Sequence, residues 1–339
     1  MSNLNKAKLS HDTDWPHADT SLPLSIIVIV HNMPSQAEKT LCSLSPSYQQ
    51  DVTEEDYEVV IVENRSDANL REEVLKSLPA NFSYHLRAES EPSPVHAVNF
   101  GGDIARGKNI CIMIDGARMV TPGVVKNLIR GHRMESSAVV TVPGYHLGRQ
   151  LQQNAIDDGY GVEEEVRLLE KIRWPANGYD LFDVSCFSGS CAAGIFRPNS
   201  ESNCISVPRE LWSKLKGFDR RFTLPGGGLL NLDYYRRACE YPGYRHVILL
   251  GEGTFHQFHG GVTTGGIDRA KRELLLEQFK AQYVAFRGAP YQCPQTEPIF
   301  LGELPDKAER FLRLSLARPS DESNDDSGIT VTSIRAVEQ

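Results

Sequence analysis

Short aliphatic runs alternate with segments of helical periodicity along much of the chain. The run from Leu24 to Val30 is apolar at almost every position, which is typical of a strand buried on both faces. From Gln36 to Leu44 the apolar residues recur at helical spacing, and Ser35 with Glu38 predicts a capping box at the start of this helix. The pattern therefore opens with a strand, a turn and a helix.

The same alternation continues toward the C-terminus. It predicts further strands at 57–62, 82–86, 110–114, 138–142 and 246–250, and helices at 69–78, 95–105, 122–134, 163–171, 231–240 and 268–286. Strands that alternate with helices indicate an α/β domain with a mostly parallel central sheet flanked by helices. Right-handed crossovers bring the C-terminal ends of parallel strands to one edge of such a sheet, and ligands bind outside that edge.

Polar residues follow three of the predicted strands, and these are the first candidates for a ligand site. They are His31 and Asn32 after the first strand, Glu63 to Asp67 after the second, and Asp115 to Arg118 after the strand at 110–114. Turns contain such residues as well, so each group taken alone fits a solvated loop equally well.

Composition and charge exclude several classes of protein. The 339 residues are 40% hydrophobic and carry a net charge of −8, so a basic surface that binds nucleic acid is not expected. Seven scattered cysteines form no C-x-x-C pair, which favours reduced thiols and gives no support for a zinc site. No P-loop occurs, and no G-x-G-x-x-G follows the first strand, so kinase and simple dehydrogenase classes lose their main support.

The two ends of the chain are polar. Residues 1–23 contain no signal-peptide core, no segment is long and apolar enough for a membrane span, and a cytoplasmic location is expected. Residues 318–339 are too polar to pack and are expected to be disordered. The less regular stretch from Gly148 to Asp183 has the character of an insertion that covers a ligand.

Four segments in order resemble the motifs of the family 2 glycosyltransferases with the GT-A fold. Pro23 to Asn32 is similar to the family's first strand, Glu58 to Asp67 to its second, Asn99 to Gly107 to its Asn-x-Gly-x-x-x-Ala-x-Gly helix, and Ile112 to Pro122 to its D-x-D strand end. The likeness extends over about Leu24 to Gly261, and the ordered set is more specific than any one motif.

The resemblance implies a sugar-nucleotide site and a divalent metal, Mg²⁺ or Mn²⁺. Glu63 would accept hydrogen bonds from the ribose or the base, and Asp115 would hold the metal that offsets the diphosphate charge. The other implied nucleotide contacts are His31, Asn32, Asn99 and Arg118.

Two positions depart from the family pattern. Ala117 replaces the second acid of the D-x-D motif, so Arg118 could substitute only by its charge. Asn231 stands where the family usually has the general base and cannot accept a proton, which leaves Asp233 as the candidate base. An acid near the start of a helix is also explained by the helix dipole alone.

A further group of candidate residues is the pair His256 and His259, which the resemblance places near the metal or the diphosphate. Two imidazoles at this spacing share one face only in a helix, and the flanking glycines disfavour a helix, so one functional histidine is more expected than two. The implied metal ligands are Asp115, His256 and His259.

These observations predict one GT-A domain at 24–317, with a nucleotide-sugar half at 24–142 and an acceptor half at 143–317. The expected activity moves a sugar from a nucleoside diphosphate sugar to an unidentified saccharide, lipid or small metabolite, with inversion. A non-catalytic sugar-nucleotide-binding protein of the same fold is the alternative, because of Ala117 and Asn231. A nucleotidyltransferase is a more distant one, and the oligomeric state, a homodimer included, stays open.

Overall fold

The computed structural model describes residues 22–88, 92–260 and 269–317. Its centre is an eight-stranded sheet in the order β12-β10-β6-β9-β4-β1-β2-β3. The strands are β1 (Leu24–Val30), β2 (Tyr57–Asn64), β3 (Phe82–Arg87), β4 (Asn109–Met113), β6 (Ala138–Thr141), β9 (Ile205–Pro208), β10 (Arg245–Leu250) and β12 (Ile299–Gly302). Only β9 runs antiparallel to its neighbours, β4 and β6, so the predicted mostly parallel sheet is confirmed.

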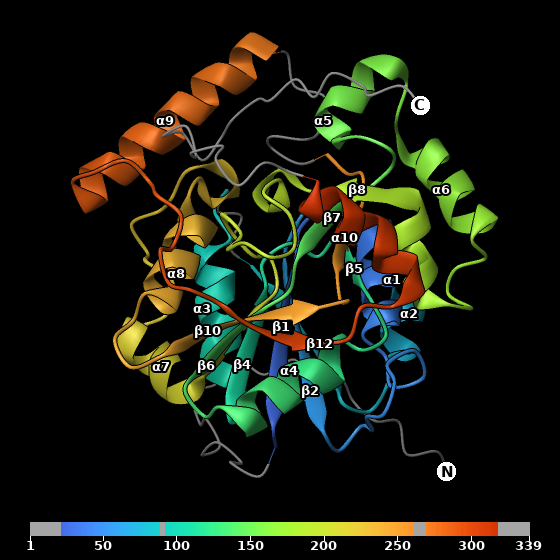
Figure 1. Ribbon diagram of the computed structural model, residues 1–339, viewed down its shortest axis with the longest axis horizontal. Coiled ribbons are helices and arrows are strands. Elements are labelled where there is room, and N and C mark those ends of the chain that lie inside the picture. The colour runs from blue at the N-terminus through green and yellow to red at the C-terminus, as the bar shows by residue number, and fades with distance from the viewer. Residues whose placement is uncertain (1–21, 89–91, 261–268, 318–339) are drawn as a thin grey trace.

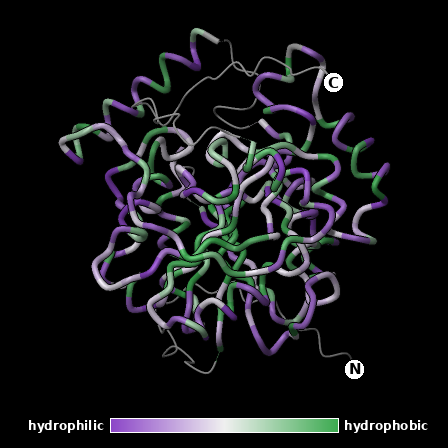
Figure 2. Tube along the Cα trace, in the orientation of Figure 1, coloured by the Kyte–Doolittle hydropathy of each residue, from purple (hydrophilic) through white to green (hydrophobic). Residues whose placement is uncertain are grey.

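Helices cover both faces of this sheet (Figure 1). One face packs against α3 (Val95–Ile104), α7 (Arg209–Leu215), α8 (Leu230–Cys239) and α9 (Arg269–Arg287). The other face packs against α1 (Pro34–Ser43), α2 (Glu72–Lys76) and α4 (Val124–Met134). Figure 2 shows the hydrophobic residues gathered on the central strands between these layers. Strands between two layers of helices are buried on both faces, which explains their continuous apolar runs.

A second, smaller sheet was not predicted. It contains β5 (Arg118–Val120), β11 (Thr254–His256), β7 (Gly144–Leu147) and β8 (Ser185–Phe187), in that order. Its core is aromatic and centres on Tyr145, which packs against Phe182, Phe255 and Phe311. These strands have only three or four residues, too few for a periodic pattern to reveal them.

The expected insertion at 148–183 folds against this smaller sheet. It contains α5 (Gln152–Ala155), α6 (Val162–Lys171) and short 3-10 turns, and the C-terminal helix α10 (Glu309–Leu316) lies close to it. None of the helices within 22–88, 92–260 and 269–317 is both long and apolar enough to cross a membrane.

Details at element ends differ from the predictions. The capping box of Ser35 and Glu38 is wrong, because α1 begins at Pro34 after the N-cap residue Met33, with no side-chain cap. Proline at the first helical position fixes the backbone for the helix and starts it earlier than the hydroxyl pattern suggests. The expectations for residues 1–21 and for the tail at 318–339 lie outside the described residues.

Candidate functional site

A cavity of about 670 Å³ opens at the C-terminal ends of β1, β2 and β4. Its floor contains side chains that follow these strands, and α9 contributes Arg272, Leu276 and Phe279 to the opposite wall. The glycine-rich turn before α8 forms another side, and Gly226, Gly227 and Gly228 all adopt positive φ there. The cavity therefore lies at the sheet edge where the strand order predicts a ligand.

Three potential metal ligands meet in this cavity. His256 Nε2 lies 3.3 Å from Asp115 Oδ2, and His259 Nε2 lies 3.7 Å from Asp115 Oδ1. The two imidazole Nε2 atoms are 3.2 Å apart, and the three ligand atoms all lie within 4.8 Å of one another. The two histidines converge although the segment is not helical, because His256 ends a strand and His259 lies in the irregular segment that follows.

The short pairing of β5 with β11 creates this cluster. In the antiparallel register His256 lies opposite Arg118, three residues after Asp115. The Asp115 carboxylate accepts a hydrogen bond from the Ala117 backbone N–H at 3.0 Å, and this contact fixes the turn after β4. The three residue pairs between β5 and β11 thus bring Asp115 close to His256, which is far away in the sequence.

A buried glutamine orients His256. Gln152, at the start of α5, has no exposed surface, and its Oε1 lies 2.6 Å from His256 Nδ1. Gln152 Nε2 also donates to the His256 carbonyl oxygen at 2.9 Å. Because Oε1 can only accept, Nδ1 carries the proton and the Nε2 lone pair faces Asp115. Such a neighbour fixes the tautomer of a metal-binding histidine.

The protonation states suit a cation. Burial raises the pKa of Asp115, but His259, His256 and Arg118 outweigh burial and hold this pKa well below its ordinary value. Burial, with Arg118 and His259, lowers the pKa of His256 to about 4 against the opposing effect of Asp115. At neutral pH the cluster therefore offers an anionic carboxylate and a neutral imidazole, the forms that bind metals.

Arg118 adds a positive charge beside the cluster. Its side chain is 9% exposed, and its Nε lies 3.3 Å from Asp115 Oδ2. Within the described residues, Nε and Nη1 have no hydrogen-bond partner, although both atoms are buried. A guanidinium that lines a cavity can bind a phosphate.

His31 and Asn32 line the cavity, together with Asn64. Asn32 has a φ of 54°, and its backbone N–H donates to Ser66 Oγ at 3.1 Å. His31 Nδ1 lies 3.4 Å from the carbonyl oxygen of Asn64. These contacts hold the ends of β1 and β2 together at the cavity floor.

Glu63 does not line the cavity, which corrects its predicted nucleoside contact. Its side chain has no exposed surface and accepts hydrogen bonds from the Leu70 backbone N–H at 3.1 Å and from the Tyr84 hydroxyl at 2.6 Å. Strand β2 continues to Asn64, and successive side chains of a strand point to opposite faces. Asn64, rather than Glu63, therefore lines the cavity.

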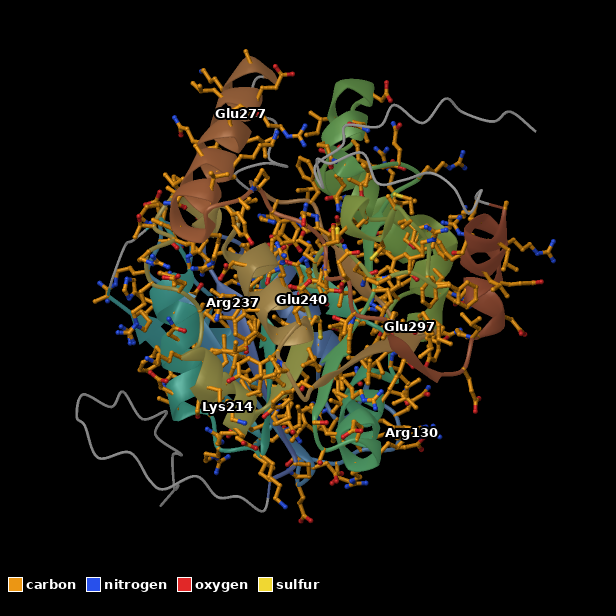
Figure 3. The ribbon with its side chains drawn as sticks, turned by 60° about the vertical axis from the view of Figure 1, so that its left-hand side comes forward. Arg130, Lys214, Arg237, Glu240, Glu277 and Glu297 are labelled. Atoms are coloured by element: carbon orange, nitrogen blue, oxygen red, sulfur yellow. The ribbon has the colours of Figure 1, made fainter. Side chains whose placement is uncertain are left out.

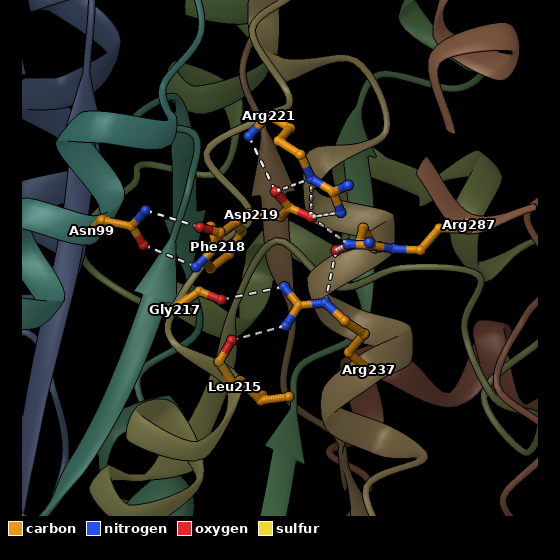
Figure 4. A network of polar contacts seen from close by, with 9 residues as sticks. Asn99, Leu215, Gly217, Phe218, Asp219, Arg221, Arg237 and Arg287 are labelled. Atoms are coloured by element: carbon orange, nitrogen blue, oxygen red, sulfur yellow. Dashed lines mark hydrogen bonds and ion pairs between the residues drawn. The ribbon is translucent and has the colours of Figure 1, made fainter. Parts of the chain in front are cut away.

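The Asn99 side chain is also bound within the protein and does not face the cavity. Its Oδ1 accepts from the Phe218 backbone N–H at 2.8 Å, and its Nδ2 donates to the Phe218 carbonyl oxygen at 2.9 Å (Figure 4). The side chain is 4% exposed and is not among the cavity residues. The predicted nucleotide contact is corrected accordingly: Asn99 joins α3 to the loop after α7.

Asp233 is likewise placed away from the cavity. Its carboxylate is 1% exposed and is bound by Arg237 Nε at 2.7 Å and by Arg287 Nε at 2.5 Å. Arg287 also binds Asp219 at 2.8 Å, as the network in Figure 4 shows. A base must reach the acceptor proton, and this carboxylate is instead held between two guanidiniums. The prediction that Asp233 faces the acceptor is wrong.

Asn231 does line the cavity, where it contacts an acid that the sequence reasoning missed. Its Nδ2 donates to Glu201 Oε2 at 3.1 Å and to the Ser202 carbonyl oxygen at 3.0 Å. Glu201 lines the same cavity. No motif surrounds Glu201, and the only available signal was the neutral residue at position 231.

Comparisons with known proteins bear on the family of the chain. The family model described as "Glycosyl transferase family 2" matches residues 25–201, more than half of the chain. The search of curated protein sequences found no match to the chain.

Solved structures with some likeness include Staphylococcus aureus TarS, at 12% identity and a TM-score of 0.46, covering 78% of this chain and 44% of that one. TarS 1–349 in complex with UDP-GlcNAc gives 14% identity and a TM-score of 0.47, covering 78% and 73%. The mannosyltransferase PcManGT from Pyrobaculum calidifontis, in complex with GDP-Man and Mn²⁺, gives 15% and 0.45, covering 89% and 72%. At these scores the likeness carries no argument about this chain's ligands.

Proposed function

Because the chain belongs to glycosyl transferase family 2, we propose that it transfers a sugar from a nucleoside diphosphate sugar to an acceptor hydroxyl, with inversion at the anomeric carbon. The α/β sheet with helices on both faces is the GT-A fold, as predicted. Residues 24–142 then hold the nucleotide and residues 143–317 supply most of the acceptor side.

The donor end of the cavity is the end that contains the residues after β1, β2 and β4. His31, Asn32 and Asn64 offer imidazole and amide groups to the nucleoside, and their place at the strand ends supports that role. Arg118 lines the same cavity beside Asp115, and its positive charge suits a contact with the diphosphate.

Asp115, His256 and His259 fit a divalent cation by the convergence of their ligand atoms and by the orientation that Gln152 imposes on His256. Two imidazoles with one carboxylate favour Mn²⁺ over Mg²⁺, which prefers oxygen ligands. Bound there, the cation would offset the charge of the departing diphosphate.

This convergence of one carboxylate and two imidazoles inside a cavity at the family's strand edge is the observation that carries the proposal. The same observation weakens one argument for the alternative, a non-catalytic binding protein. The loss of the second D-x-D acid at Ala117 does not leave Asp115 alone, because the two histidines complete a three-ligand set.

The test measures nucleoside diphosphate release from a panel of nucleotide sugars that begins with UDP-GlcNAc and GDP-mannose, with and without Mn²⁺. We expect Mn²⁺-dependent release by the wild-type chain. Asp115→Asn should lower it at least about a hundredfold, since the ligand set loses its only charge. Glu55→Gln, at an exposed position that does not line the cavity, is the control and should retain wild-type release. A wild-type chain that binds a nucleotide sugar but releases no diphosphate would favour the non-catalytic alternative.

A further inference from the structure

Glu201 and Asp115 extend beyond the same edge of the central sheet. Strand β9 is antiparallel to β4, and Ile205 pairs with Ile112. The residues that precede β9 therefore lie beside those that follow β4, and both acids line the cavity. Topology thus gives the cavity a second carboxylate, in the segment just before the strand that pairs with β4.

Only one oxygen of the Glu201 carboxylate accepts a hydrogen bond from the described residues. Its Oε2 accepts the hydrogen bond from Asn231 Nδ2, while no residue of the described ranges donates to its Oε1. The side chain is intermediate in burial, between the solvated and the fully enclosed groups of the cavity. One oxygen is therefore fixed in direction and the other remains able to accept a proton.

The neutral residue at position 231 matches this arrangement. Asn231 is 7% exposed on the first turn of α8. An aspartate there would put two carboxylates about 3 Å apart, where like charges oppose ionisation of both. The Asn231 amide N–H instead donates a hydrogen bond to Glu201 Oε2. The family pattern has an acid at position 231. Its replacement by a neutral amide here is therefore consistent with a carboxylate at position 201.

The surroundings of Glu201 suit an uncharged, hydroxyl-rich acceptor. Hydroxyl and amide side chains line this part of the cavity, and they are those of Ser188, Ser190, Ser200 and Asn203. Such groups form hydrogen bonds with sugar hydroxyls without selecting a charge.

We propose that Glu201 is the general base of the transfer reaction and that Asn231 is its positioning residue. This inference rests on the proposed function. The Glu201 carboxylate takes the proton of the acceptor O–H as the acceptor oxygen forms its bond to the anomeric carbon. The bond from that carbon to the diphosphate oxygen breaks on the opposite face, and its electron pair leaves with the nucleoside diphosphate.

The first experiment follows nucleoside diphosphate release from the best donor of the panel, with Mn²⁺ and with water or methyl β-glucoside as the acceptor. Glu201→Gln keeps the hydrogen bond from Asn231 but cannot take a proton. We expect its kcat to fall at least about a hundredfold with the donor KM nearly unchanged. Glu201→Asp should recover part of the loss. The control Glu297→Gln makes the same chemical change on the surface and should behave as the wild type (Figure 3).

The outcomes separate the two proposals. Calorimetry of nucleoside diphosphate with Mn²⁺ should give the same affinity for Glu201→Gln and the wild type, and this also shows that the variant is folded. Near-normal kcat in Glu201→Gln would overturn the base while the proposed function stood. A wild-type chain that releases no diphosphate from any donor would overturn both.

The positioning role has its own readout. In Asn231→Asp a second carboxylate should move the low-pH fall of kcat toward higher pH, because Glu201 then ionises less readily. Asn231→Ala should lower kcat without raising the donor KM. An unchanged pH profile in Asn231→Asp would refute the coupling between the two residues.

Discussion

Asp233 joins helix α8 to the end of α9, and Asp233→Asn neutralises this link. The carboxylate is 1% exposed and contacts Arg237 and Arg287, whose side chains are 25% and 24% exposed. Removing one partner of a fully buried ion pair costs about 3–5 kcal/mol. Both guanidiniums keep other partners here, Asp219 for Arg287 and the carbonyl oxygens of Leu215 and Gly217 for Arg237. With their partial exposure, we expect a loss of about 2–3 kcal/mol.

Urea unfolding followed by circular dichroism measures this loss. Glu277→Gln removes an exposed pair with Lys280 on α9 and should change the free energy of unfolding by at most about 0.5 kcal/mol (Figure 3). Turnover per folded molecule of Asp233→Asn should stay within a few-fold of the wild type. A variant of normal stability that loses about a hundredfold in turnover would refute this reasoning and restore Asp233 as the base.

Three further predictions concern other positions. Burial raises the pKa of Glu165 to about 7, so the folded state holds its proton more tightly than the unfolded state, and stability falls as pH rises through this range. Glu165→Gln should therefore stabilise the protein by up to about 3 kcal/mol near pH 8.5 and little near pH 4, which urea unfolding at both pH values would check. Gln152→Leu removes the partner of His256 Nδ1, and Mn²⁺ affinity measured by calorimetry should fall about 10- to 100-fold; an unchanged affinity would contradict the orienting role. In Gly102→Ala the new Cβ would overlap the Trp212 ring, so the melting temperature should fall with a cost of about 1–3 kcal/mol, and an unchanged value would mean that the ring moves freely.

The large sheet could be predicted because its strands are buried on both faces. The apolar run at Leu24–Val30 matches β1 at both ends, since every one of its residues is buried. The antiparallel β9 and the three-residue strands β5, β8 and β11 could not, because so few residues carry no periodicity. The predicted strand before Asp115 therefore placed this residue at the sheet edge. The pattern could not explain why the side chains of His256 and His259 converge there.

The misplaced residues share one physical cause: tertiary partners that the local pattern does not reveal set each side chain's direction. Glu63 is turned to Leu70 and Tyr84, and Asp233 is bound by Arg287, 54 residues later in the chain. Local arguments from a strand end or a helix dipole contain no information on such partners. Glu201 was missed for the same reason, because its importance depends on Asn231, 30 residues away.

The pairing of β5 with β11 also sets an order of events during synthesis. Residues 118–120 emerge from the ribosome long before residues 254–256, with which they pair. The nascent chain can form β1, β2, β3 and β4 early. At that stage Asp115 has been synthesised, but His256 and His259 have not. Long-range pairing that closes such a loop is slow relative to local contacts. A chain released at residue 201, where the family match ends, would contain most of the nucleotide edge and no three-ligand cluster.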